Sequence, residues 1–191
     1  MRVFIAIDID EATKKAIQEL QQELASKVDI RKSDVKWVRP DAIHLTLKFL
    51  GEIKDESVVE VCRIVEEAVK GHKSFDIELE TVGYFGGRSA RVLWVGCGAG
   101  SDKLLRLQED TELRLADAGW PKEQRKFTGH LTLCRVRNSS AGVKLARVTD
   151  ACKDRKVGVI EADSVVVYQS RLHPTGPVYT QLGNYKLQNR T

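Results

Sequence analysis

The 191-residue sequence lacks the features that define several large classes of protein. No stretch approaches the run of about 18 apolar residues that a membrane helix needs, and residues 1–10 alternate apolar and polar side chains where a signal peptide would have a continuous apolar segment. The four cysteines are widely spaced and form no CxxC pair, so we expect reduced, mostly buried thiols and no zinc site. These absences predict a cytoplasmic protein with no membrane partner.

A strong excess of charge of one sign is also missing. The 31 basic and 27 acidic residues give a net charge of +4, which by itself does not identify a nucleic-acid-binding protein. With 42% hydrophobic and 30% charged residues, the composition is that of an ordinary globular protein. The length suits one domain or two small lobes that share an interface.

Basic residues nevertheless cluster at two places in the chain. They could simply solubilise loops, but each cluster flanks a copy of the tetrapeptide described next, which favours an anionic substrate. The first cluster is Arg31, Lys32, Lys36 and Arg39, and the second is Lys122, Arg125, Lys126, Arg135 and Arg137.

The tetrapeptide His-Leu-Thr-Leu occurs twice, beginning at His44 and at His130. Side chains alternate between the two faces of a strand, so each copy presents its histidine and its threonine, Thr46 or Thr132, on one face and its leucines on the other. We therefore expect one site built from four polar side chains.

The elements around the two copies repeat as strand, helix, motif strand, helix and strand. The offset is 89 residues for the opening strands and 86 for the histidines. This repetition predicts one bilobal α+β domain over 1–191 with pseudo-twofold halves at about 1–88 and 89–187, in which two antiparallel sheets line a central cleft and helices pack outside. The expected strands are 2–9, 35–38, 43–50, 75–85, 90–97, 126–136, 158–168 and 179–187, and the expected helices are 11–28, 55–70, 102–118 and 141–152.

A histidine on a strand is often only a hydrogen-bonded structural residue. Two histidines and two threonines at matching places are different, because each buried polar group without a partner would cost about 1–3 kcal/mol, so a shared wet cleft is the better explanation. One neutral and one protonated imidazole can remove and supply a proton, while the hydroxyls donate to oxygens between them. This layout suits a phosphodiester and needs no metal or other cofactor; the remaining histidines, His72 and His173, offer no ligand spacing.

The extended motifs HLTLKFLG and FTGHLTLCRV resemble those of the 2H phosphoesterases, and more closely the RNA 2′,3′-cyclic phosphodiesterases that are also described as 2′-5′ RNA ligases. The opening RVFIAIDID and the late GPVYTQL are similar as well. The resemblance implies hydrolysis of a 2′,3′-cyclic phosphate to a 2′-phosphomonoester. It makes His44 the general acid for the 3′ oxygen and His130 the general base for water, with Thr46 and Thr132 holding phosphate oxygens. In ligation a 5′-hydroxyl replaces water in the same chemistry. A near-symmetric site can run in either sense, so the two histidines can exchange roles.

The residues that directly follow the two tetrapeptides raise questions of strand geometry. The family tends to place a basic residue five positions after the second histidine, which Arg135 matches, but strand alternation puts Arg135 on the face opposite His130 unless the strand twists or bulges. The counterpart of Arg135 in the first copy is Phe49. Alternation also puts Lys48 beside His44, as a candidate substrate contact, and Cys134 beside His130, where a catalytic thiol is the lesser alternative.

The expected partner is RNA or a nucleotide that ends in a 2′,3′-cyclic phosphate, bound by a monomer. A nucleotide- or RNA-binding module without turnover is the alternative, although the complete set of histidines and threonines favours an enzyme. A cyclic phosphate on a small nucleotide or an ADP-ribose derivative would be a different substrate for the same chemistry. Aromatic residues that could stack on a base, or pack in the core, are Tyr84, Phe85, Phe127 and Tyr168.

Overall fold

The computed structural model describes residues 1–174 and 176–190, which form an α+β fold around one curled antiparallel sheet. Within these residues the sheet has nine strands in the order β7-β4-β5-β6-β3-β1-β8-β9, with β2 paired to β6. The strands are β1 (Arg2–Ile7), β2 (Val35–Trp37), β3 (Leu45–Glu52), β4 (Phe75–Phe85), β5 (Val92–Cys97), β6 (His130–Val136), β7 (Lys156–Ala162), β8 (Ser164–His173) and β9 (Gly176–Lys186).

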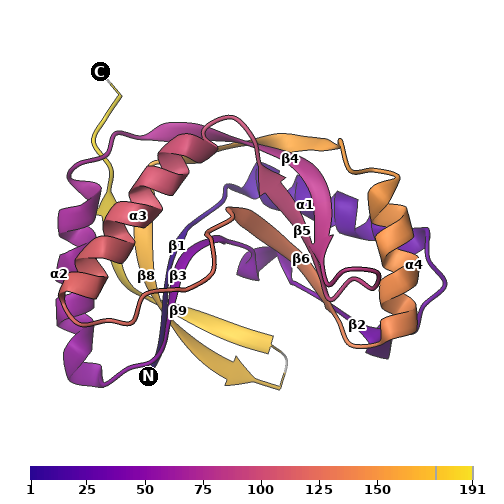
Figure 1. The fold of residues 1–191 in the computed structure, drawn as a ribbon, viewed down its shortest axis with the longest axis horizontal. Coiled ribbons are helices and arrows are strands. Elements are labelled where there is room, and N and C mark those ends of the chain that lie inside the picture. The colour runs from indigo at the N-terminus through magenta and orange to yellow at the C-terminus, as the bar shows by residue number, and fades with distance from the viewer. Residues whose placement is uncertain (175, 191) are drawn as a thin grey trace.

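Four α-helices in this part of the chain pack on the sheet as two pairs (Figure 1). They are α1 (Glu11–Ser26), α2 (Val58–Val69), α3 (Ser101–Asp117) and α4 (Ser139–Asp150). Asp10 begins α1 by accepting a hydrogen bond from the Thr13 amide at 2.6 Å, and Asn138 begins α4 in the same way with two amides. Buried helix residues join the inward-facing strand residues in one hydrophobic core. None of the described helices is long and apolar enough to cross a membrane.

The two repeats exchange strands. β4, from the first repeat, pairs with β5 of the second, while β8, from the second repeat, pairs with β1 of the first. Motif strands β3 and β6 meet at the centre of the sheet. The pseudo-twofold relation therefore runs through the centre, with β3 matching β6, β1 matching β5, β4 matching β8 and β7 matching β9.

Two expectations about the sheet are wrong. The predicted pair of sheets is a single sheet, because the motif strands join it through the Leu45–Leu131 pair. The predicted strand over 158–168 is two strands that break at Asp163, since β7 pairs with β4 at one end of the sheet and β8 pairs with β1 near the other. The chain crosses between the lobes at this break. The other predicted elements are present with shifted ends, the largest shift being at β6, which begins at His130.

Candidate active site

The two tetrapeptides lie side by side at the centre of the sheet. Leu45 of β3 pairs with Leu131 of β6, and both leucines are fully buried against the core. In an antiparallel pair, the residue before Leu45 lies opposite the residue after Leu131, and the residue after Leu45 lies opposite the residue before Leu131. Because side chains alternate, these four point to the face opposite the two leucines. This register places His44 by Thr132, and by the same rule Thr46 by His130, on the face away from the core, where all four are half-buried.

Both imidazoles are held in the same way. The Nδ1 atom of His44 is 3.1 Å from the carbonyl oxygen of Ala42, and that of His130 is 2.7 Å from the carbonyl oxygen of Thr128. A carbonyl oxygen can only accept a hydrogen bond, so Nδ1 carries the proton in each ring. Each Nε2 is then left with its lone pair, as a base requires, and becomes a donor when the ring is protonated.

Aromatic side chains surround His44. Its ring stacks on Phe4 at a centroid distance of 4.6 Å and meets the edge of Tyr179 at 5.3 Å. Burial lowers the pKa of His44 to about 4, although the Ala42 carbonyl and the nearby Asp8 carboxylate oppose this change. The Asp8 carboxylate also accepts the hydroxyl of Tyr168 at 2.8 Å. His44 is consequently a neutral imidazole near pH 7 in the free protein.

A different aromatic pair surrounds His130. Phe85 meets its ring edge-on at 5.2 Å, and Trp94 lies 6.4 Å away. The Trp94 indole lies over Gly83, where an added Cβ would come within 2.4 Å of the ring. Glycine at position 83 therefore lets Trp94 reach across β4 toward the histidine. Of the other aromatic residues considered for stacking, Tyr84 and Phe127 pack against the core.

Each motif strand contains a β-bulge just after its threonine. On β3, Thr46 pairs with Ala6 and Lys48 with Ile5, so Leu47 is an extra residue. On β6, Thr132 pairs with Trp94 and Cys134 with Leu93, so Leu133 is extra in the same way. An extra residue reverses the alternation of side chains beyond it. On both strands, the side chains after the bulge therefore point to the face opposite the one that strict alternation predicts.

On β6 the bulge brings Arg135 to the histidine face. Arg135 is exposed, and directly opposite it on β2 is the exposed Lys36, so two cations share this face. Arg135 also lies close enough to Tyr179 to oppose the rise in its pKa that burial causes. On β3 the same reversal brings Phe49 to the histidine face, where it is 60% exposed and its ring is 5.8 Å from that of Phe4. The sequence did not predict Lys36, Phe4 and Tyr179 as site residues, because only the pairing of strands that are distant in the sequence brings them to the site.

The bulges also correct two expectations about neighbours of the histidines. Cys134 does not share the face of His130: it is fully buried, and burial raises the pKa of its thiol to about 12. A thiolate nucleophile at this position is thereby disfavoured. Lys48 does not share the face of His44 either, since its residue is only 7% exposed on the core side of β3.

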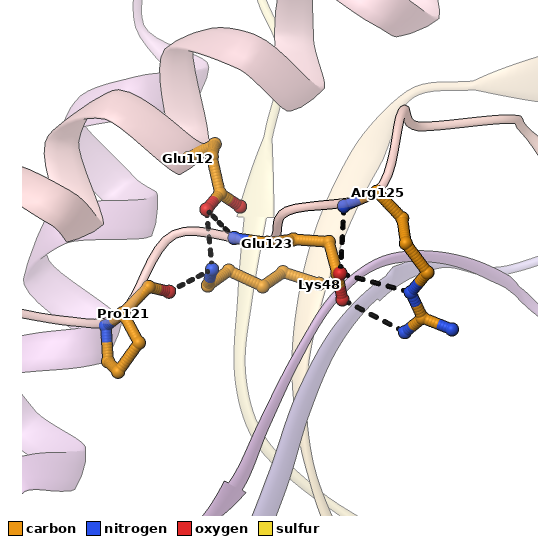
Figure 2. Close-up of polar contacts among 5 residues, drawn as sticks. All are labelled: Lys48, Glu112, Pro121, Glu123 and Arg125. Carbon is orange, nitrogen blue, oxygen red and sulfur yellow. Dashed lines mark hydrogen bonds and ion pairs between the residues drawn. The ribbon is translucent and has the colours of Figure 1, made fainter.

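The Lys48 ammonium group is engaged inside the protein (Figure 2). It donates to Glu112 of α3 at 2.7 Å and to the Pro121 carbonyl at 2.9 Å. The same Glu112 oxygen accepts the Glu123 amide at 2.9 Å, and Glu123 in turn holds Arg125. Lys48 therefore ties the first motif strand to the loop that leads into the second, and it is not available as the substrate contact that we expected.

Gln21 has the matching position in the other half. When α1 and α3 are aligned on their buried positions, from Thr13 with Leu104 to Leu24 with Leu115, Gln21 aligns with Glu112. The Gln21 amide donates to the carbonyls of Val38 and Leu133, each at 2.8 Å. Leu133 is the extra residue of the β6 bulge. Gln21 on α1 and Glu112 on α3 thus each bind one motif strand and the segment that precedes the other motif.

The described residues contain no group of three or more His, Cys, Asp or Glu side chains placed to hold a metal ion. His72 is half-buried, with its Nε2 3.3 Å from Asp110. His173 is exposed at the end of β8.

Comparison with known proteins identifies the family. The family model for LigT-like phosphoesterases matches residues 7–94 and, a second time, residues 95–179. The chain belongs to the LigT-like phosphoesterase family. The predicted resemblance to 2H phosphoesterases is confirmed, and so is the repeat.

Relatives of this LigT-like chain match it over nearly its whole length. An RNA 2′,3′-cyclic phosphodiesterase of Thermotoga maritima is 33% identical over 95% of the chain and 93% of the relative. The crystal structure of TT0787 from Thermus thermophilus is 25% identical, covers 100% of both chains and has a TM-score of 0.82. The structure of Escherichia coli LigT with 3′-AMP has a TM-score of 0.77 at 23% identity over 97% of both chains, which shows a common fold.

Proposed function

We propose that this protein hydrolyses the 2′,3′-cyclic phosphate at the end of an RNA or a nucleotide to a 2′-phosphomonoester, without a metal ion. The observation that carries the proposal is the matched pair of histidines. Each has Nδ1 bound to a backbone carbonyl and each turns Nε2 to the same face of the sheet, on either side of the Leu45–Leu131 pair. The curated relatives are RNA 2′,3′-cyclic phosphodiesterases, which supports the same reaction class.

In the proposed reaction, Nε2 of His130 takes a proton from water, and the water oxygen attacks phosphorus. The bond from phosphorus to O3′ breaks, and Nε2 of His44 gives its proton to O3′, which leaves the phosphate on O2′. The hydroxyls of Thr46 and Thr132 donate to the two nonbridging oxygens, and Arg135 supplies a positive charge beside them. When a 5′-hydroxyl replaces water as the nucleophile, the same step forms a 2′-5′ bond, and O3′ again leaves with the proton from His44.

The low pKa of His44 must be reconciled with its role as an acid. Because a pKa of about 4 leaves the ring neutral near pH 7, His44 has to take up a proton from solvent when the substrate binds. The negative charge of a phosphodiester against the imidazole favours the charged ring and raises its pKa. His44 is then protonated in the complex, while His130 remains the base.

The test is turnover of a 2′,3′-cyclic mononucleotide, and of an RNA with that end, in the presence of EDTA. The product is identified by chromatography, and a 2′-phosphate is expected. His44→Ala and His130→Ala should each reduce kcat by at least about 100-fold, the size of a general acid or base contribution. Full activity in either variant would contradict the two-histidine mechanism, and activity only with added metal would contradict the metal-free one. Binding without turnover would identify a binding module.

A further inference from the structure

The β8–β9 ribbon extends the sheet beyond the site. β1 pairs with β8 only as far as the Arg2–Ser170 pair. From Arg171 to His173, β9 is the only strand partner of β8 within the described residues, and this part of the ribbon projects from the body of the molecule (Figure 1). Arg171, Leu172 and His173 are all exposed, so a partner can reach this part of the ribbon.

One face of this ribbon continues the histidine face. Tyr168 pairs with Phe4, which stacks on His44, and by alternation Ser170 and Leu172 lie on the same face of β8. Tyr179 of β9, opposite Ser170, shares this face because its ring meets that of His44 at 5.3 Å. From Tyr168 to Leu172 this face runs for about 13 Å at roughly 3.3 Å per residue.

The surface combines apolar groups with positive charge. Leu172 is 74% exposed and lies at the outer end of the face. Arg39 donates to the Pro177 carbonyl of β9 at 3.2 Å and is 3.2 Å from its neighbour Asp41, which neutralises part of its charge. Arg2 lies opposite Ser170 at the start of the projecting part. Apolar and aromatic side chains beside arginines are the usual means of binding single-stranded nucleic acid.

The chemistry of the reaction gives the direction of the strand. The leaving O3′ belongs to the ribose of the last nucleotide, so that ribose lies on the side of the acid, His44. The nucleotides that precede it must continue from the same side, which is where the ribbon begins. Water enters on the other side, at His130.

We propose that the histidine face of the β8–β9 ribbon, together with Arg2 and Arg39, binds the nucleotides that precede the cyclic phosphate in a single-stranded RNA. Tyr179 and Leu172 contact ribose or base, and the two arginines contact phosphates. This binding surface, which we call the RNA path, rests on the proposed function, because it binds the nucleotides that precede the cyclic phosphate of the proposed substrate. The preferred substrate is consequently an RNA 3′ end and not a free cyclic nucleotide.

The test compares 2′,3′-cyclic mononucleotide with oligoribonucleotides of up to about six residues that end in the same group. The wild-type kcat/KM should rise with the first added nucleotides and then level off. In Arg2→Ala and Arg39→Gln, the ratio of oligonucleotide to mononucleotide kcat/KM should fall about tenfold, as removal of a charged hydrogen bond predicts. The salt dependence of log KM should weaken by about 0.7 for each phosphate that the variant no longer binds. Arg171→Ala is the matched control, because alternation puts Arg171 on the opposite face of the same ribbon.

Equal kcat/KM for mononucleotide and oligonucleotide, or an equal loss in Arg171→Ala, would overturn the RNA path while leaving the proposed function intact. If neither substrate is turned over, the proposed function fails. The path is then judged by direct binding of a fluorescent single-stranded RNA with a 2′-phosphate end. Weaker binding in Arg39→Gln than in Arg171→Ala supports it, and identical binding refutes it.

Discussion

The chemistry of His44 depends strongly on its neighbours. Phe4 and Tyr179 displace water from its ring, and this burial lowers its pKa to about 4 from an ordinary value near 6.5. Between these pH values the unfolded chain binds a proton at His44 that the folded protein does not bind. Folding is therefore less favourable at the acidic end of this range.

The first prediction concerns stability against pH. The His44 contribution is fully present above about pH 6.5 and is lost as the pH falls toward 4, with a total of at most about 3 kcal/mol. Denaturant unfolding at pH 7 and at pH 4.5 measures it, and His44→Gln should lose less stability over this range than the wild type. The same pH dependence in both proteins would contradict the low pKa.

The second prediction concerns catalysis against pH. The pH profile of kcat/KM reports the free enzyme and that of kcat reports the substrate complex. We expect the limb that belongs to His44 near pH 4 in kcat/KM and at a higher pH in kcat, because the bound phosphate favours the imidazolium. If this limb has the same pKa in both profiles, protonation on binding is wrong, and His130 becomes the better candidate for the acid.

At the scale of the strand, the bulges determine which side chains reach the site. Leu133 is the extra residue of β6, and its carbonyl accepts both the Gln21 side chain and the Val38 amide. These two hydrogen bonds stabilise the bulge, and the bulge places Arg135 on the histidine face. The sequence leaves this undecided, because a bulge depends on the partner strand and on a helix more than a hundred residues away.

The third prediction tests the support of the β6 bulge. Gln21→Leu removes one buried and one partly buried hydrogen bond and should lower the free energy of unfolding by about 1–3 kcal/mol. It should also raise KM, because Arg135 is less firmly placed. Gln22→Leu is the matched control, since Gln22 is exposed on the same helix. Equal effects of the two substitutions on KM would show that Gln21 does not position the site.

The fourth prediction concerns the buried pair of Lys48 and Glu112. Lys48→Met leaves the carboxylate buried without its cation and should cost about 3–5 kcal/mol, whereas exposed Lys54→Met should change stability little. The double variant Lys48→Met, Glu112→Leu should recover much of the loss, because no unpaired charge remains. Denaturant unfolding of the wild type, Lys48→Met, Glu112→Leu and the double variant gives the coupling. Additive losses would mean that the pair does not act as a unit.

At the scale of the whole molecule, strand exchange makes the two repeats interdependent. β4 lies between β5 and β7, which both come from the second half of the chain, and β1 lies beside β8. Each half by itself would expose unpaired strand edges and half of a shared core.

The fifth prediction follows from this exchange. A fragment of residues 1–88 should show no cooperative unfolding transition, while the full chain should unfold in one transition that coincides by circular dichroism and tryptophan fluorescence. Mixing the two halves should restore the transition. A cooperative transition in the isolated first fragment would show that its strands do not need their partners.

The sequence by itself determined the repeat, the polar face of each tetrapeptide and the approximate places of the helices. These follow from local rules, because alternation, amphipathic spacing and capping depend on residues a few positions apart. Only the tertiary structure decided that there is one sheet, that Arg135 turns toward the histidines while Lys48 and Cys134 turn inward, and that burial lowers the pKa of His44. Each of these depends on strand pairing or on water excluded by distant side chains, such as Tyr179 against His44. Contacts of that kind form only when the chain is folded.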